Sequence, residues 1–320
     1  GDKMDKRINA KKFIVDTDIG ADCDDTVALA YLLGKEKARL CEIKAVTLCT
    51  TRNHAPACVK AILGQFGRAD VNVGIYKGAP LICDAVDNYS EDVAIKYNPG
   101  YDYLSTDNAV RLIRKTLAES QEKIDIIELG PLCNISALLK SEPDEFSPLN
   151  GIEIVKEKVE KMYLMGCRFF AGDGNDALEA EWNIEQDIDG ASFVMQNFPS
   201  EIIVCPFETG ERVTTYSYSV SGVVYDCMHY YEENRNRRKG LRFDAGVYTR
   251  PSWDPLTAML ALSDERMSFK LSNFGYITID KKGVSTFVEK TGGKHRFLLY
   301  DRDMVKKAER VLNEFLRSIR

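Results

Sequence analysis

The sequence lacks the signals of several common protein classes. No stretch approaches the roughly 18 consecutive apolar residues that a membrane-spanning helix needs. Basic residues are not in excess, since 43 lysines and arginines stand against 49 aspartates and glutamates, a net charge of −6. Such a chain has no general attraction for nucleic-acid backbones, and the basic run at 235–239 is expected to be a solvated loop or helix end. We therefore expect no membrane span and no nucleic-acid partner.

Paired cysteine motifs are also missing. The nine cysteines are an odd number at irregular spacing, and no two of them form a Cys-x-x-Cys pair. This pattern argues against a zinc site and against a full disulfide framework. We expect most of these cysteines to be buried, weakly polar core residues.

The chain begins at Gly1 without an initiator methionine or an apolar leader. A glycine before such a start is typical of a tag-cleavage scar, so residues 1–12 are expected to be a polar lead-in. A removed export signal would place the native protein in a periplasm, whereas the cysteine usage favours the cytoplasm. Both compartments stay open.

Short apolar runs typical of β-strands alternate with helical patterns along the chain. Strands are expected at 13–16, 43–48, 124–129, 161–165 and 201–205, and helices at 26–33, 57–65 and 135–139. This alternation predicts one α/β domain over residues 13–320, with a mostly parallel, Rossmann-like central sheet flanked by helices. No repeat and no linker divides it. Segments 84–104 and 207–252 are long excursions, expected as lids over the C-terminal ends of the strands.

Ligands of open parallel sheets bind beyond the carboxyl ends of the strands, where polar residues carry the most information. The loop after the first strand reads DTDIGADCDD and holds five carboxylates in ten residues: Asp16, Asp18, Asp22, Asp24 and Asp25. Left unpaired, these charges repel one another, and a shared cation would hold them together. Ligands that are all oxygen favour a hard ion, calcium or magnesium.

Simpler interpretations of this loop explain less. Helix-capping aspartates in a solvated turn are favourable at a helix N-terminus, but they account for one or two carboxylates and not for five. An EF-hand fails because no twelve-residue loop starting at one of the first three aspartates ends on glutamate. A sharper rival is a haloacid-dehalogenase-type phosphatase, which also begins with an apolar strand followed by Asp-x-Asp.

The strand and loop together, FIVDTDIGADCDD, resemble the N-terminal fingerprint DxDxGxDD of the inosine-uridine nucleoside hydrolase family. Three further segments agree with that family in the same order. They are IELGPLCN at 127–134, similar to its central strand and turn, GNDALEAEWNI at 174–184, similar to its ribose-binding segment, and PSWDPLTA at 251–258, similar to the segment with the last metal ligand. Each motif alone is weak, but four in order favour this family over the phosphatase.

The resemblance implies a calcium-dependent enzyme that hydrolyses the N-glycosidic bond of ribonucleosides to ribose and free base. Its metal site, carried over position by position, becomes Asp18, Asp25, the backbone carbonyl of Leu129, and Asp254. Asp18 is also the expected general base. The implied partner is a small-molecule nucleoside, and the implied assembly is a homo-oligomer, a dimer or tetramer.

The resemblance also implies the contacts to the sugar. Asp24 and Asn183 would hold ribose hydroxyls, and Asn175 and Glu181 would hold the 5′ end. Asn53, which follows the second strand, lies near another ribose-side position of the family.

The acidic loop is two residues longer than the short form of the family. Asp22 and Cys23 look inserted, because the final pair of aspartates then stays against the following helix. Asp16 and Asp22 are expected to support the loop from outside the ligand set. A ligand role for Asp22 is the alternative.

The residue before Asp254 departs from the inosine-uridine type, which has a histidine there that protonates the departing base. This chain has Trp253, and none of its three histidines lies in a matching motif. Tryptophan at this place is similar to the purine-preferring branch of the family, where stacking on the base helps it to leave, so purine nucleosides are the expected substrates. Trp182 is open between stacking and core packing, because neighbours on a strand face opposite ways. Tyr231 and the other tyrosines of the 207–252 excursion are expected mainly to pack against their neighbours, and a contact of one of them with the base is the alternative.

Two functions of other classes stay open beside the hydrolase. One is a magnesium-dependent phosphatase of the haloacid-dehalogenase type. The other is a non-catalytic, calcium-dependent riboside-binding protein, in which the missing histidine means lost activity. The complete set of carboxylates argues against this second alternative.

Overall fold

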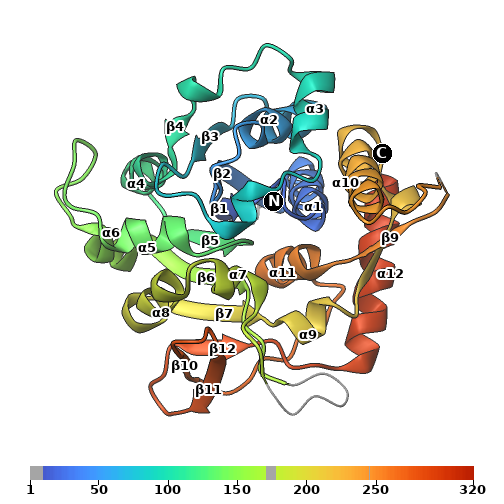
Figure 1. Cartoon of the computed structure of the whole chain (residues 1–320). Coiled ribbons are helices and arrows are strands. Elements are labelled where there is room, and N and C mark those ends of the chain that lie inside the picture. Colours follow the sequence, from blue (N-terminus) through green and yellow to red (C-terminus); the bar gives the residue numbers. More distant parts are fainter. Residues whose placement is uncertain (1–9, 171–177, 245) are drawn as a thin grey trace, which may run out of the picture.

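The computed structural model describes residues 10–170, 178–244 and 246–320. Ten strands of these segments form the central sheet, in the order β11-β10-β12-β7-β6-β5-β1-β2-β3-β4 (Figure 1). The strands are β1 (Lys11–Thr17), β2 (Cys41–Leu48), β3 (Asn72–Ile75), β4 (Asp107–Asn108), β5 (Ile124–Glu128), β6 (Val159–Met165), β7 (Glu201–Cys205), β10 (Gly275–Ile279), β11 (Ser285–Glu289) and β12 (His295–Phe297). A separate two-stranded sheet pairs β8 (Thr214–Tyr216) with β9 (Thr249–Pro251).

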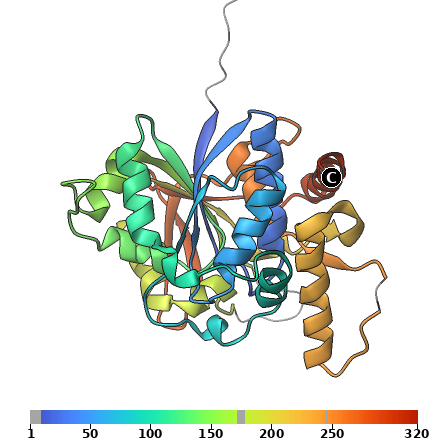
Figure 2. The same ribbon diagram turned by 90° about the horizontal axis from the view of Figure 1, so that it is seen from above.

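Helices surround the sheet. They are α1 (Asp24–Lys37), α2 (Ala55–Gln65), α3 (Ser90–Tyr97), α4 (Ala109–Glu119), α5 (Cys133–Leu139), α6 (Gly151–Lys158), α7 (Trp182–Gln186), α8 (Ile188–Asn197), α9 (Phe207–Gly210), α10 (Gly222–Arg238), α11 (Trp253–Leu262) and α12 (Arg302–Ser318). Figure 2 shows helices on both sides of the sheet, as the alternation of strands and helices predicts. The basic run at 235–239 lies at the C-terminal end of α10, in agreement with the expected helix end.

Strand β1 shows why the sequence places this sheet in the core. It pairs in parallel with β2 on one side and with β5 on the other. Phe13 and Val15 belong to the hydrophobic core on one face of the sheet, and Ile14 belongs to the core on the other face. Since successive strand residues face opposite ways, a strand covered on both faces must be a continuous apolar run.

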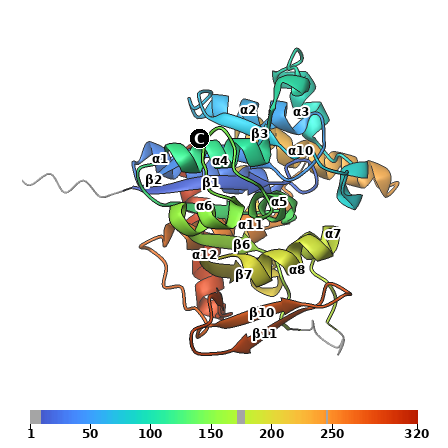
Figure 3. The same ribbon diagram turned by 90° about the vertical axis from the view of Figure 1, so that its left-hand side faces the viewer.

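The sheet is parallel from β12 to β4 and antiparallel only at the end that carries β10 and β11. Figure 3 shows this terminal hairpin at one end of the molecule. The predicted single α/β architecture with a mostly parallel sheet is thus confirmed. The predicted strands and helices all exist, with starts within two residues of the expected ones.

The expectation of buried cysteines is also met. All nine cysteines are buried and free. Within the described segments, no helix combines the length and the apolar character needed to cross a membrane.

The parallel strands place the loops that follow β1, β5, β6 and β7 at one edge of the sheet. Both long excursions reach this edge. The first forms α3, and the second forms α9, β8, α10 and β9, with α10 packed against α3 (Figure 1). The polar residues after the strands therefore share one site with residues of the excursions.

Candidate active site at the carboxyl edge of the sheet

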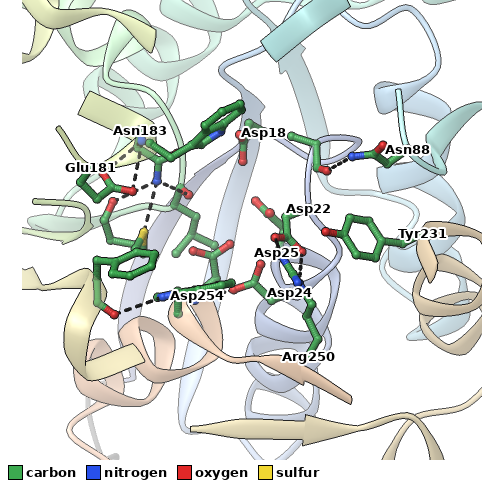
Figure 4. A pocket seen from close by; sticks show the side chains of 16 residues that line it. Asp18, Asp22, Asp24, Asp25, Asn88, Glu181, Asn183, Tyr231, Arg250 and Asp254 are labelled. Carbon is green, nitrogen blue, oxygen red and sulfur yellow. Dashed lines mark hydrogen bonds and ion pairs between the residues drawn. The ribbon is translucent and has the colours of Figure 1, made fainter. Parts of the chain in front are cut away.

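A cavity of about 350 Å³ opens at this edge of the sheet (Figure 4). Its lining residues are Asp18, Ala21, Asp22, Asp24, Asp25, Asn88, Leu129, Met165, Glu181, Trp182, Asn183, Phe207, Tyr231, Arg250, Trp253 and Asp254. They come from the loops after β1, β5 and β6, from α7, and from both excursions. This convergence brings together most of the residues that the four sequence motifs singled out.

The acidic centre of the cavity is made where the N-termini of two helices meet. Asp24 and Asp25 open α1, and Asp254 is the second residue of α11, which packs against α1. Carboxylate oxygens of these three residues lie within 4.8 Å of one another. The Asp254 backbone N–H donates to Asp24 at 3.0 Å, and the Thr17 hydroxyl donates to Asp25. Helix N-termini favour negative charge, so the fold itself gathers these acids.

These acids are short of positive charge. Asp24, Asp25 and Asp254 are only 2%, 1% and 3% exposed. Burial, followed by repulsion between neighbouring carboxylates, raises the pKa of all three well above the ordinary range. Burial also raises the pKa of Asp18, and the charge of Arg52 opposes that rise. A donor set made only of oxygens, with more acids than nearby cations, fits a hard divalent cation.

The GPLCN turn after β5 fits closely against the acidic loop. A side-chain carbon at Gly130 would lie 2.5 Å from the Cys49 sulfur and 3.0 Å from the Asp18 Cβ. Only glycine therefore allows this approach, which places Leu129 on the cavity wall. The carbonyl of Leu129 accepts a hydrogen bond of 3.2 Å from the Asn183 amide.

Asp16 lies behind the cavity, fully buried. Its carboxylate accepts hydrogen bonds from the Thr47 hydroxyl at 2.6 Å and from the Asn134 amide at 2.9 Å. It also lies within hydrogen-bonding reach of Glu128, and burial raises the pKa of both groups. One carboxyl oxygen of Asp16 and one of Glu128 have no hydrogen-bond partner among the described residues, and a proton shared by the pair would satisfy them. The sequence analysis assigned no role to Glu128, although it lies within the IELGPLCN motif, because the pairing with Asp16 joins two strands and no local pattern shows it.

One wall of the cavity is built by the start of α7. The Glu181 carboxylate caps this helix and accepts from the backbone N–H groups of Asn183 and Ile184 at 3.0 Å and 3.3 Å. Asn183 donates to the carbonyls of Leu129 and Met165. Burial raises the pKa of Glu181 to about 8, against the opposing effect of the two backbone hydrogen bonds. Asn175, the other residue expected at the 5′ end, lies outside the described residues.

The structure does not bring Asn53 to this cavity. It is exposed in the turn before α2 and is not a lining residue. Its neighbour Arg52 turns inward instead, donates to the carbonyls of Cys83 and Val86, and lies 3.6 Å from the Asp84 carboxylate. In a turn, a shift of one residue decides which side chain points inward. The expected ribose contact of Asn53 stays a prediction that the geometry of this cavity does not support.

The two tryptophans both line the cavity. Trp182 begins a helix and is 51% exposed, so the core-packing alternative, which assumed a strand, is wrong. Trp253 donates from its indole nitrogen to the Phe207 carbonyl at 3.1 Å, and its ring stacks on Phe207 with 5.4 Å between ring centroids. The three histidines are not lining residues.

Arg250 and Tyr231 were not predicted as site residues. Arg250 lies in β9 and forms an ion pair with Asp22, in which its Nε donates at 2.8 Å. Its guanidinium lies 4.9 Å from the ring centroid of Tyr231 and 5.3 Å from that of Trp253. Tyr231 comes from α10, so the 207–252 excursion forms one wall of the cavity. No sequence motif marks either residue.

Comparisons with known proteins agree on one family. The model of the inosine-uridine preferring nucleoside hydrolase family matches residues 13–311. The pyrimidine-specific ribonucleoside hydrolase RihA of Escherichia coli strain SMS-3-5 is 26% identical over 275 residues, which are 80% of this chain and 81% of that protein.

Solved structures of similar fold include a plant nucleoside hydrolase, PpNRh1, with a TM-score of 0.69, 19% identity, and coverage of 96% of this chain and 99% of that one. The purine-preferring ribonucleoside hydrolase of Gardnerella vaginalis has a TM-score of 0.65 at 19% identity, over 96% of this chain and 100% of that one. One of these relatives is named for pyrimidines and another for purines, so the likeness does not confirm the predicted purine branch. Because the family model spans most of the sequence and the fold agrees with it, the chain belongs to the inosine-uridine preferring nucleoside hydrolase family.

Proposed function

We propose that the chain is a calcium-dependent nucleoside hydrolase that prefers purine ribonucleosides. Membership of the family supports the reaction class, hydrolysis of the N-glycosidic bond of ribonucleosides. The observation that carries the metal is the buried group of Asp24, Asp25 and Asp254, whose oxygens lie within 4.8 Å of one another. Calcium accommodates many oxygen ligands in flexible geometry, which suits carboxylates from two different helices.

Asp18, Asp25, Asp254 and the Leu129 carbonyl would hold the ion, with Asp24 beside them. A bound ion would polarise the attacking water and lower its pKa. Asp18 takes the proton of that water as the general base, an effect typically worth about 10²–10⁴-fold. The remaining carboxylates stabilise the positive charge that develops on the ribose as the glycosidic bond breaks.

The sugar is held by residues of the α7 wall and of the acidic loop. Asn183 and Asp24 contact ribose hydroxyls, and Glu181 holds the 5′ end together with Asn175. Asn183 also donates to the Leu129 carbonyl, so the sugar contact and the proposed metal ligand are fixed relative to each other. Because this hydrogen bond links the two, the ribose would be held in reactive geometry beside the metal.

Trp253 is proposed to stack on the departing base. Its indole nitrogen is already bonded to the Phe207 carbonyl, and Phe207 supports its ring. It therefore offers an aromatic surface and not a proton. A wide purine gains more from that surface than a pyrimidine does, which favours purine nucleosides.

A reducing-sugar assay over inosine, guanosine, adenosine, uridine and cytidine tests the proposal, with chelated protein and with calcium restored. The expected result is ribose release that needs calcium and is fastest with purines. Phosphate release from aryl phosphates without any ribose release would favour the phosphatase. Tight nucleoside binding without ribose release would favour the riboside-binding protein.

A further inference from the structure

The proposed function assigns no role to Arg250, the one cation among the residues that line the cavity. Arg250 lies on the side of the cavity away from Glu181 and Asn183 (Figure 4). Its side chain is 18% exposed, so most of it is covered and it does not project into solvent. The proposed contacts to the metal and to the ribose do not use it.

The guanidinium of Arg250 is held firmly in this place. Asp22 accepts from Nε at 2.8 Å and also from Nη2, which is the two-point geometry that suits an arginine and a carboxylate. The rings of Tyr231 and Trp253 also contact the guanidinium, whose central carbon lies 4.9 Å and 5.3 Å from their ring centroids. A cation fixed by a carboxylate and two aromatic rings loses little freedom when it binds a ligand.

The other edge of this guanidinium is available. A guanidinium carries five N–H donors, and Asp22 engages only the Nε–Nη2 edge. Within the described part of the chain, Nη1 has no hydrogen-bond acceptor. Two other lining donors are engaged, since the Trp253 indole donates to Phe207 and the Asn183 amide donates to two carbonyls. The available edge is a fork that fits two neighbouring acceptor atoms.

We infer that Arg250 holds the acceptor edge of the departing base, and that Asp22 positions Arg250 for this contact. The inference rests on the proposed function, because Trp253 then stacks on the base that Arg250 contacts. A 6-oxopurine presents the acceptors O6 and N7 side by side, the pair that arginine forks recognise on guanine. Adenine presents an amino donor in place of O6. The substrate class is therefore the 6-oxopurine ribonucleosides, inosine and guanosine.

The contact acts where negative charge develops. As the C1′–N9 bond breaks, its electron pair goes to the base, the oxygen of water forms the new bond to C1′, and the proton of that water goes to Asp18. The charge on the base spreads to N7 and O6, which accept hydrogen bonds from Arg250. Arg250 stays protonated throughout. The base takes its proton from solvent, so nucleoside and water give ribose and neutral base.

The test compares substrates that differ only at the leaving group. We would measure kcat/KM with calcium for inosine, 7-deazainosine, adenosine and nitrophenyl riboside, whose nitrophenolate leaves without needing a donor. Arg250→Lys keeps the positive charge but loses the two-point hydrogen-bond donor, and Arg250→Gln loses both. Asp22→Asn removes the carboxylate that holds Arg250 in place. Arg111→Lys is the matched control, because Arg111 pairs with Asp107 at 3.0 Å and lies 4.8 Å from the Phe146 ring outside the cavity.

Wild-type protein should cleave inosine faster than adenosine and faster than 7-deazainosine, which has carbon in place of N7. Arg250→Lys should lower kcat/KM for inosine by roughly 5- to 150-fold, the range for a two-point arginine contact, with a much smaller loss on nitrophenyl riboside. Asp22→Asn should lower inosine cleavage selectively and in the same direction. Arg111→Lys should leave every substrate unchanged.

Equal losses on inosine and nitrophenyl riboside would overturn the inference, since the role of Arg250 would then be structural. Equal cleavage of inosine, 7-deazainosine and adenosine by the wild type would also overturn it, and this comparison needs no variant to fold. In both cases purines could still be cleaved faster than pyrimidines, and the proposed function would stand. If the wild type releases ribose from no nucleoside but cleaves nitrophenyl riboside, the proposed function fails separately.

Discussion

Glu181 is a buried acid that the fold keeps largely protonated at neutral pH. The residue is 3% exposed, and among the described residues no lysine or arginine forms an ion pair with it. Backbone N–H groups of Asn183 and Ile184 favour its ionised form, but burial outweighs them and raises its pKa from 4.5 to about 8. Glutamine at this position has nearly the same size and still offers an oxygen that accepts from the N–H groups at the start of α7, but it has no proton to lose.

The size of the effect follows from this pKa. A rise of about 3.5 units, at 1.36 kcal/mol per unit, makes ionised Glu181 cost about 5 kcal/mol of folding free energy. The folded state binds the proton more tightly than the unfolded state. The stabilisation from protonated Glu181 is therefore fully present below about pH 4.5 and is lost as the pH rises to about 8. Wild-type protein should lose up to about this much stability relative to Glu181→Gln across that interval.

Urea unfolding of chelated protein between about pH 5 and 9 measures the difference. The free energy of unfolding of the wild type should fall relative to Glu181→Gln up to about pH 8, and the difference should then be constant. Glu185→Gln is the matched control, because Glu185 lies on the same helix and is exposed. Parallel curves for wild type and Glu181→Gln over this range would refute the argument, because Glu181 would then ionise equally easily in both states.

Three further outcomes are expected for the proposed reaction. Asp25→Ala should remove calcium binding and ribose release together, because Asp25 is an expected principal ligand, and an active variant that retains stoichiometric calcium in equilibrium dialysis would contradict this. Asp18→Asn should slow single-turnover hydrolysis by about 10²–10⁴-fold while competition assays still detect nucleoside binding, and near-full turnover would assign the base role to another residue. Trp253→Ala should narrow the gap in kcat/KM between inosine and uridine by about 2- to 13-fold, the loss of one aromatic contact, and a gap that stays unchanged would exclude stacking by Trp253.

The parts of the fold that the sequence predicts well are those with a strong local pattern. Strands β1, β5 and β7 are buried on both faces, so each is a short, mostly apolar run with clear ends. The terminal hairpin was not predicted. In β10 buried and exposed residues alternate, and its partner β11 is mostly exposed, so neither is the apolar run by which the central strands were recognised.

The site divides in the same way. Asp18, Asp25 and Asp254 were predicted because motifs mark them, and the meeting of two helix N-termini brings Asp25 and Asp254 together. Asn53 does not line the cavity, and spacing alone cannot tell which residue of a turn faces inward. The contact of Asp22 with Arg250 spans 228 positions and depends on how β9 docks against the acidic loop, which no local pattern encodes.

The ion pair between Asp22 and Arg250 also explains how so many acids can share one cavity. Arg250 neutralises Asp22, and the raised pKa of Glu181 keeps that group largely neutral, so four lining aspartates are left: Asp18, Asp24, Asp25 and Asp254. A divalent ion would offset about half of their full charge, and the rest would surround a ribose carbon that turns positive during the reaction. Among the lining residues Arg250 is the one cation, and it lies beside the acidic loop, on the side of the cavity away from Glu181 and Asn183, where the proposed contact to the departing base would be made. The proposed reaction, in which the bond breaks into a positive sugar and a negative base, would use both the aspartates and Arg250.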